Sequence, residues 1–490
     1  MKTFTIELTI TARVILTVFV LMILAFALIV LGLFDFTNKL HIYVVLFIIL
    51  SSTFLLIYRG KKQLDPFSPL FGLTILLFLY SFSSALFVEV NQANFAGDSI
   101  STDTLLIYYI SCLVALVGLN GGALMAKYSN FGWCAVTKYD LFSRSKDTFY
   151  NKAITYAVLF GLILLPFFYS YFDITNIPSY AERALASRVE RLANPASGIK
   201  EIFTVYLPVT LILVATILLF FRSDKKIIKI LATFIFLLYV FRNTLAGWRS
   251  LVVTPVMLAV IYYHYRIKRL TLWLLLIVGI SLYIFMNVLS FARVTSDPKE
   301  MVEIIANEFS ENIVERLNIV SSSELQVGSN LMRLIEGIDK GEASYSWGTS
   351  ILTEILVFVP KALMPNRPLP LGEKYVEIFH PGELLEGAGY GMFIVQEGYW
   401  ALGIFGVLLF MFIYGWIVEK IYQLFINNMG YDAAVFCYGM VYLSLVLFAV
   451  RSGIILNFKT AIMNCLPLIL ILVLPSFFRG RSLKNNHRPM

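Results

Sequence analysis

The chain has 490 residues, of which 59% are hydrophobic and only 14% are charged. This composition, with a mean hydropathy of +0.78, excludes a soluble globular protein of this length and indicates a polytopic membrane protein. The net charge of +8 would suit a nucleic-acid-binding protein, but in so apolar a chain the basic residues more simply orient membrane spans, and no nucleic-acid partner is expected. The four cysteines are scattered without CxxC spacing, so neither a disulfide framework nor a zinc site is expected.

Long apolar stretches recur from one end of the chain to the other. A bilayer core takes roughly 20 apolar residues per helical span, and this length predicts about twelve spans. They cover residues 12–34, 40–58, 66–88, 104–126, 151–171, 202–221, 226–241, 250–265, 271–291, 392–417, 433–450 and 457–478. The predicted fold class is therefore all-α, with one transmembrane domain over residues 1–490.

Lysine and arginine are concentrated in connections that alternate along the chain. If the spans alternate in direction, all of these connections fall on one side, which the positive-inside rule assigns to the cytoplasm together with both termini. The basic segments are "YRGKKQLD", "KYDLFSRSK", "FRSDKK", "YRIKR" and the tail "FFRGRSLKNNHR". The outer face then carries the loop 89–103, an amphipathic loop 172–201, the turn 242–249, a large loop 292–391 and a short turn after Val450.

The outer segments hold more positive charge than topology rules allow for that face. The basic residues placed there are Arg183, Arg188, Arg191, Arg242, Arg249, Arg293, Arg316, Arg333, Lys361, Arg367 and Arg451. Any one of them could direct its charge towards lipid headgroups, but that does not explain their concentration on this face. Because guanidinium groups bind phosphate oxygens in a fork, the shared ligand that fits best is a pyrophosphate attached to a lipid.

Three outer stretches have helical character. "AERALASRVERL" (181–192) and "MVEIIANEFSENIVERL" (301–317) carry apolar residues at helical spacing and are predicted to be amphipathic helices. The first could equally lie on the membrane surface or bind substrate. "GTSILTEILVFVPKALMPNRPLP" has an apolar run of about ten residues ended by Pro360, too short to span a bilayer. We expect a re-entrant or surface helix there, followed by a loop stiffened by prolines.

The order of several short motifs resembles the Wzy-type polymerases of bacterial surface polysaccharides, the O-antigen or oligosaccharide repeat-unit polymerase family. The motifs are "GWRS" with Arg249, "FAR" with Arg293, "FVPKALMPNRP" with Lys361 and Arg367, the glycine-rich stretch "EGAGYGMFIVQEGYW", and "VRSG" with Arg451. They run in order over roughly residues 240–455. The chain departs from the family at Lys361, where arginine is frequent, and by lacking an R-x10-G spacing, so the arginine roles cannot be transferred wholesale.

The resemblance implies a membrane glycosyltransferase with a fold like that of the GT-C enzymes. It would transfer a growing glycan from undecaprenyl pyrophosphate to a sugar hydroxyl on a lipid-pyrophosphate-linked repeat unit, at the outer, periplasmic face of the cytoplasmic membrane. It also implies two protein partners, a chain-length regulator and a flippase. No cofactor is expected, and no metal, because the outer segments lack compact ligand spacing and arginines could stabilise the leaving pyrophosphate instead.

Site residues follow from this interpretation. Arg249, Arg293 and Arg451 would form a pyrophosphate cage, with Arg316, Lys361 and Arg367 closing over it. Further substrate contacts are expected from Arg183, Arg188, Arg191, Arg242 and Tyr390.

The acceptor hydroxyl needs a base, and Glu397 is placed best, because an ionisable residue in an apolar stretch is a functional candidate. It could equally be the partner of one of the arginines. His380, with Glu383 and Glu386, is a weaker alternative for the base. Aromatic residues including Tyr390 could stack on sugars, although membrane anchoring explains them more simply.

Two other functions compete with a polymerase. A ligase that moves a finished glycan to a different acceptor would need the same donor site. A lipid-linked oligosaccharide flippase or another transporter would instead show repeats and charged residues near the bilayer midplane, whereas here most charged residues map to one surface. Motif order favours the polymerase.

Overall fold

The computed structural model describes residues 39–59, 65–91, 100–129, 149–163, 207–245, 249–291, 303, 325–356, 358–359, 363–364, 367–382 and 390–484. Within these ranges every regular element is a helix, and the β-type pairing is an isolated bridge between Met392 and Ser452. The predicted all-α class is confirmed for this part of the chain.

The helices are named here in chain order. They are α2 (Lys39–Arg59), α3 (Pro69–Asn91), α4 (Thr102–Tyr128), α5 (Phe149–Ile163), α9 (Leu207–Arg222), α10 (Lys226–Leu245), α11 (Arg249–Arg266), α12 (Leu272–Phe291), α15 (Gly328–Asp339), α16 (Thr349–Leu356), α17 (Leu371–Phe379), α18 (Ile394–Asn428), α19 (Asp432–Tyr442), the π-helical turn η4 (Leu443–Leu447), α20 (Ala449–Ser452) and α21 (Ile454–Lys484).

Five of the described helices are long and apolar enough to cross a membrane. They are Lys39–Tyr58, Pro69–Glu89, Thr102–Tyr128, Lys226–Thr244 and Ile394–Asn428, and they match the predicted spans 40–58, 66–88, 104–126, 226–241 and 392–417. The other predicted spans from 151–171 onward overlap the described helices α5, α9, α11, α12, α19 with η4, and α21. The first predicted span, 12–34, lies outside the described residues, so the total of about twelve stays a prediction.

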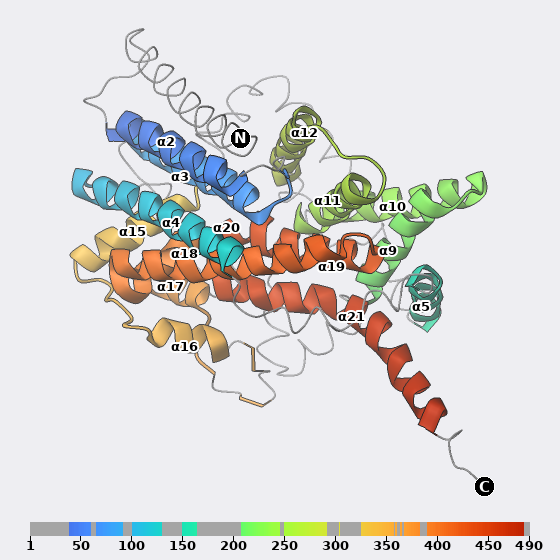
Figure 1. Ribbon diagram of the computed structural model, residues 1–490. Helices are drawn as coiled ribbons and strands as arrows, with labels where there is room; N and C mark the ends of the chain where they lie inside the picture. Colours follow the sequence, from blue (N-terminus) through green and yellow to red (C-terminus); the bar gives the residue numbers. More distant parts are fainter. Residues whose placement is uncertain are drawn as a thin grey trace, which may run out of the picture.

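The long helices α2, α3, α4 and α18 lie side by side, and α15, α16 and α17 gather at one end of this layer (Figure 1). These three short helices belong to the predicted large outer loop 292–391. The amphipathic helices predicted at 181–192 and 301–317 lie outside the described residues, apart from Glu303.

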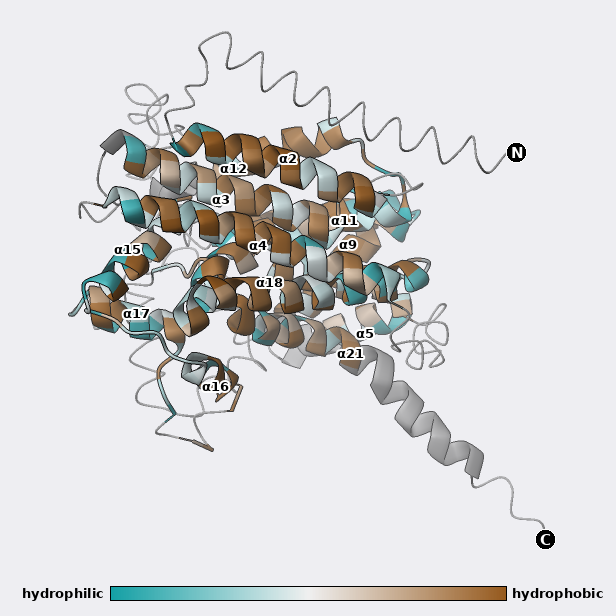
Figure 2. Cartoon of the chain, turned by 60° about the vertical axis from the view of Figure 1, so that its left-hand side comes forward, coloured by the Kyte–Doolittle hydropathy of each residue, from teal (hydrophilic) through white to brown (hydrophobic). Residues whose placement is uncertain are grey.

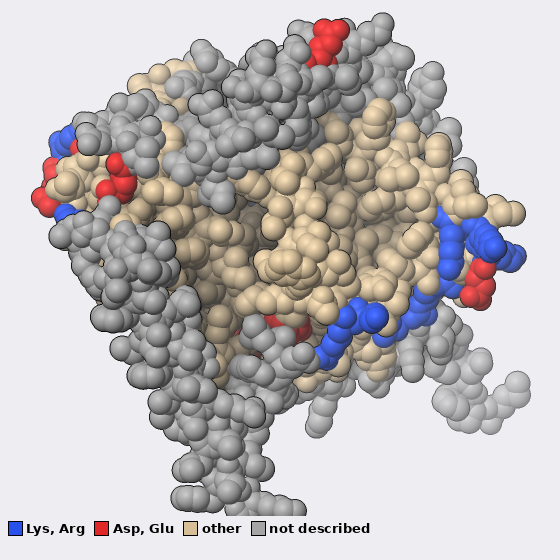
Figure 3. Space-filling model, turned by 90° about the horizontal axis from the view of Figure 1, so that it is seen from above, with Lys and Arg blue, Asp and Glu red and all other residues tan. Residues whose placement is uncertain are grey.

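Apolar side chains cover much of the outside of the bundle (Figure 2). Ile230 on α10 is 68% exposed and Trp273 on α12 is 73% exposed. One face of the molecule is broadly uncharged, with lysine and arginine gathered along its edge (Figure 3). A surface of this kind suits lipid rather than water, as expected of a membrane protein.

Glycines allow α4 and α18 to pack with their backbones in contact. A Cβ atom at Gly118 would lie 2.7 Å from the Leu408 carbonyl oxygen, and one at Gly122 would overlap the carbonyl oxygen of Phe412. On α18, a Cβ atom at Gly415 would overlap the carbonyl oxygen of Leu119 in α4, so glycine is needed there as well. Small residues spaced four apart are a common means of close helix packing in membranes, where lipid offers no hydrophobic driving force.

A backbone break divides α18. Leu402 and Gly403 have non-helical dihedral angles, and Gly403 has a φ of 63° and a ψ of −147°, which a residue with a side chain rarely adopts. The break falls within the predicted span 392–417. The first turns of α18, up to Ala401, therefore take a direction of their own near the end that carries α15–α17.

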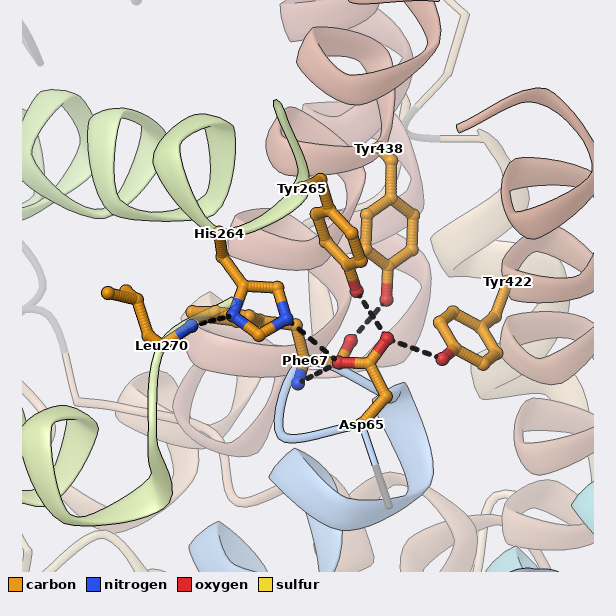
Figure 4. A network of polar contacts seen from close by, with 7 residues as sticks. All are labelled: Asp65, Phe67, His264, Tyr265, Leu270, Tyr422 and Tyr438. Carbon is orange, nitrogen blue, oxygen red and sulfur yellow. Dashed lines mark hydrogen bonds and ion pairs between the residues drawn. The ribbon is translucent and has the colours of Figure 1, made fainter. Parts of the chain in front are cut away.

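A polar cluster fixes the opposite end of the bundle, where the predicted cytoplasmic segments meet (Figure 4). Asp65 accepts hydrogen bonds from the hydroxyl groups of Tyr265 and Tyr422, each at 2.7 Å, and from the backbone N–H of Phe67 at 2.9 Å. His264 Nε2 lies 3.7 Å from the same carboxylate. The cluster joins the segment before α3 to α11 and α18.

Candidate active site

Two of the predicted cage arginines act electrostatically on the same buried side chain. Arg249 begins α11 and is only 5% exposed, while Arg451 lies in α20 and is half-buried. Both guanidinium groups interact electrostatically with the hydroxyl of Tyr80, a buried residue in the middle of α3. Three helices that are far apart in sequence thus place two positive charges within electrostatic range of one phenol. A guanidinium group is always charged, so this arrangement concentrates positive charge in a largely buried place.

A change of helix type sets the direction of the segment that carries Arg451. The π-helical turn η4 ends immediately before it, with the Phe448 N–H donating to the Leu443 carbonyl at 3.0 Å. The Tyr414 hydroxyl of α18 donates to the Leu445 carbonyl within the turn. Single π-helical turns are rare in proteins, and those that occur are often found at functional sites.

The chain after Arg451 is held by backbone hydrogen bonds to the segment that enters α18. The Met392 N–H donates to the Arg451 carbonyl at 2.9 Å, and the Gly453 N–H donates to the Met392 carbonyl at 3.1 Å. Gly453 has a φ of 81° and ends α20, so that α21 can start in a new direction. Asn330 of α15 adds a hydrogen bond of 2.6 Å to the Gly391 carbonyl, which ties the predicted outer loop to the same place.

Glu397 lies beside this break and is only 3% exposed. Its Oε2 atom accepts a hydrogen bond from the Ile454 N–H at 2.5 Å, and the Ile455 N–H also donates to the carboxyl group. These N–H groups begin α21 and have no partner within the helix, so Glu397 acts as their cap. The sequence-based interpretations of Glu397, a general base or an arginine partner, stay predictions, and the helix cap is a further role that the structure shows.

A second buried carboxyl group lies near the first. Glu354 of α16 is 3% exposed, accepts a hydrogen bond from the Leu371 N–H at the start of α17, and interacts electrostatically with Glu397. Burial raises the pKa of Glu354 above its usual value, and the hydrogen bond from Leu371 opposes that change. Lys459 of α21 also acts on this carboxyl group.

Aromatic rings line the neighbouring outer segments. Tyr390 stacks on His380 with ring centroids 4.0 Å apart and an interplanar angle of 5°. The ring of Tyr375 lies between Tyr390 and Trp400, at 6.4 Å and 6.5 Å. Tyr390 lies two residues before Met392, whose N–H donates to the Arg451 carbonyl. The aromatic group is therefore close along the chain to the backbone contact with Arg451.

The remaining predicted site residues divide into two sets. Arg242 lies near the end of α10, 3.4 Å from the side-chain oxygen of Asn243, and Arg367 donates to the Val359 carbonyl at 3.0 Å in the loop between α16 and α17. Arg183, Arg188, Arg191, Arg293, Arg316 and Lys361 lie outside the described residues. Glu383 and Glu386 lie outside them as well.

The sequence signals used above did not point to Tyr80 or Glu354. Tyr80 is one tyrosine within an apolar span, and only the packing of α3 against α20 gives it significance. Glu354 has the same signal as Glu397, an acidic residue within an apolar run, and that signal could have identified it. Among the described residues, no three histidine, cysteine, aspartate or glutamate side chains are grouped so that they could hold a metal ion.

Comparison with known proteins gives one match. A family model described as O-antigen polysaccharide polymerase Wzy matches residues 14–481, nearly the whole chain. No curated protein and no solved structure matches.

Proposed function

We propose a catalytic mechanism for this chain, which belongs to the O-antigen polysaccharide polymerase Wzy family. Family membership supports polymerisation of lipid-linked oligosaccharide repeat units in the membrane. The more detailed proposal is that the donor is a glycan on undecaprenyl pyrophosphate, and that transfer takes place at the outer face of the cytoplasmic membrane.

The burial of Arg249 and the electrostatic action of Arg249 and Arg451 on the buried Tyr80 hydroxyl support this proposal. In the reaction, the acceptor hydroxyl oxygen forms a bond to the anomeric carbon of the donor glycan. The bond from that carbon to the pyrophosphate breaks, the pyrophosphate leaves with the electron pair, and the hydroxyl proton passes to a base or to solvent. Fixed cations stabilise the charge that develops on the leaving group, and the Tyr80 hydroxyl can donate a further hydrogen bond to a phosphate oxygen.

Residues of the outer loops would complete the site. Arg293 joins the pair as a third cage residue, while Arg316, Lys361 and Arg367 close over the pyrophosphate from the large loop. Arg183, Arg188, Arg191 and Arg242 contact the lipid-linked substrates, and Tyr390 presents its ring to a sugar. In this proposal the arginines do the work of a divalent ion, and a chain-length regulator and a flippase act beside the enzyme.

The test uses purified protein in vesicles with a lipid-pyrophosphate-linked repeat unit and a chelator. The wild type is compared with Arg249→Ala and Arg451→Ala, and with Arg269→Ala as a matched control, because Arg269 is exposed at the opposite end of the bundle. We expect a ladder of longer glycans from the wild type and from the control. In the two site variants kcat should fall by about 100-fold or more, as when one donor to a developing negative charge is removed.

The other outcomes identify what fails. Normal ladders from both site variants would refute the arginine cage and leave polymerase activity intact. A wild type that needs a divalent ion would refute metal independence. Transfer of a single glycan to a different acceptor would indicate a ligase, and movement of the unextended substrate across the vesicle membrane would indicate a transporter.

A further inference from the structure

Helix α16 has its polar and apolar sides reversed relative to a helix that faces water. Its buried side chains include Ser350, at 5% exposed, and Glu354, at 3% exposed. Its exposed side chains include Leu352, at 61%, and Ile355, at 52%. In water, the exposed Leu352 and Ile355 would gain no hydrophobic stabilisation, and burial of the Glu354 carboxyl group would still cost its hydration. The helix is therefore suited to apolar surroundings.

The neighbouring helices of the same outer loop show the ordinary polarity. Helix α17 buries Leu371, Tyr375, Val376 and Phe379, and it exposes Glu373, Lys374 and Glu377. Helix α15 likewise buries Leu331, Leu334 and Ile335 and is followed by the exposed Lys340. Among α15, α16 and α17, only α16 exposes large apolar side chains, although α15 also buries the polar Ser329 and Glu336.

Helix α16 adjoins long helices that also expose apolar side chains. Helix α16 packs against α18 and α21, and those helices themselves expose apolar side chains, among them Phe405 at 66% and Ile462 at 52%. Beyond α16 the apolar surface continues to Leu363, at 79% exposed. Figure 2 shows α16 beside α18, with hydrophobic residues in the segment that follows it.

A tryptophan marks the start of this surface. Trp347, two residues before α16, is 76% exposed and has a φ of 49°, a conformation that costs energy for a residue with a side chain. Hydrogen bonds hold its turn, because the Ser346 N–H donates to the Trp400 carbonyl at 2.9 Å and the Thr349 N–H donates to the Ser346 carbonyl at 2.9 Å. Tryptophan is enriched where membrane and water meet, so a ring presented in this way suits the boundary between them.

We propose that α16 is embedded in the lipid bilayer, with Leu352 and Ile355 against acyl chains and Trp347 at the membrane–water boundary. The helix is too short to cross the membrane, and it would enter and leave on the same side. Its polar face points inward to Leu371 and towards Glu397. The helix would then separate the bilayer from the buried carboxyl groups of Glu354 and Glu397. This proposal depends on burial and polarity alone and does not require the polymerase mechanism.

Nitroxide scanning tests the proposal on the full-length protein in lipid vesicles. Single cysteines are introduced as Leu352→Cys and Ile355→Cys on α16, with Glu373→Cys and Glu377→Cys on α17 as matched controls, after replacement of the native cysteines. Each label is then exposed to oxygen, which concentrates in lipid, and to a water-soluble nickel chelate. All four positions are exposed, so the labels do not disturb the core.

The expected result is opposite accessibility on the two helices. Labels at 352 and 355 should relax faster with oxygen than with the nickel chelate, and labels at 373 and 377 should do the reverse, so that the logarithm of the accessibility ratio changes sign. If the α16 labels are as accessible to the chelate as the α17 labels, the helix faces water and the proposal is wrong. Low accessibility to both reagents would show a protein surface covering α16, which would also overturn it.

Discussion

Glu397 lies beside the break in the chain that follows Arg451, where it can hold that segment in position. Its carboxyl group receives the N–H groups that begin α21, and a Cβ atom at Gly453 would lie 3.6 Å from its Oε2 atom. Arg451 is only two residues before this glycine. We therefore expect Glu397→Gln, which keeps an oxygen able to accept those hydrogen bonds, to retain activity within about tenfold, whereas Glu397→Ala should lose far more. The measurement is kcat/KM for chain extension, with the fraction of folded protein determined for each variant.

The pH profile distinguishes a positioning residue from a base. If Glu397 removed the proton from the acceptor hydroxyl, the glutamine variant would be as inactive as the alanine variant. The acidic limb seen in the wild-type pH profile would then be missing from the profile of the glutamine variant. For a positioning residue, the glutamine variant keeps that limb.

At the scale of elements, the contact between α4 and α18 decides how closely the long helices approach. Gly122→Ala should separate the two helices, because the new methyl group would overlap the Phe412 carbonyl oxygen, and we expect a loss of about 1–3 kcal/mol in the free energy of unfolding. Gly121→Ala is the matched control. Its Cβ would meet the Phe412 ring at 3.6 Å, an ordinary contact, so stability should stay the same or rise by about 0.5–1 kcal/mol. Denaturant unfolding in detergent micelles measures both, and equal losses in the two variants would contradict the close-packing interpretation.

At the scale of the whole molecule, the polar groups at the two ends have separate roles. The Asp65 cluster joins helices at the end opposite to Arg249 and Arg451, and Asp65→Ala would leave the hydroxyl groups of Tyr265 and Tyr422 without their acceptor. We expect a loss of about 1–3 kcal/mol in stability, and about 1 kcal/mol for Tyr422→Phe, which removes a single hydrogen bond. Thermal unfolding measures these changes. Chain extension per folded molecule should stay at the wild-type value, and a drop in kcat at unchanged stability would show that this end contributes to the reaction.

Hydropathy located the long apolar helices, but it missed the short helices α15 and α17 and the contacts between helices. The predicted spans 40–58 and 226–241 agree with α2 and α10 to within a few residues, because the apolar length of a span is a local property. The π-helical turn before Arg451 and the break at Gly403 depend on packing between helices, and no short window of sequence contains that information. For the same reason Arg249 and Arg451 were predicted from motifs, while Tyr80 emerged only from the way α3 lies against α20.

The pairing of Met392 with Arg451 has a consequence for biosynthesis. The chain is inserted from its N-terminus, so α3 and Arg249 reach the membrane long before α20 is translated. The arginine pair beside Tyr80 cannot form until the ribosome has passed residue 451, and the backbone pairing that holds α20 needs Gly453 as well. A nascent or prematurely terminated chain that ends before Gly453 lacks the backbone pairing that holds α20, even if its earlier helices are already in the membrane. The timing of translation thus keeps unfinished chains from assembling the site.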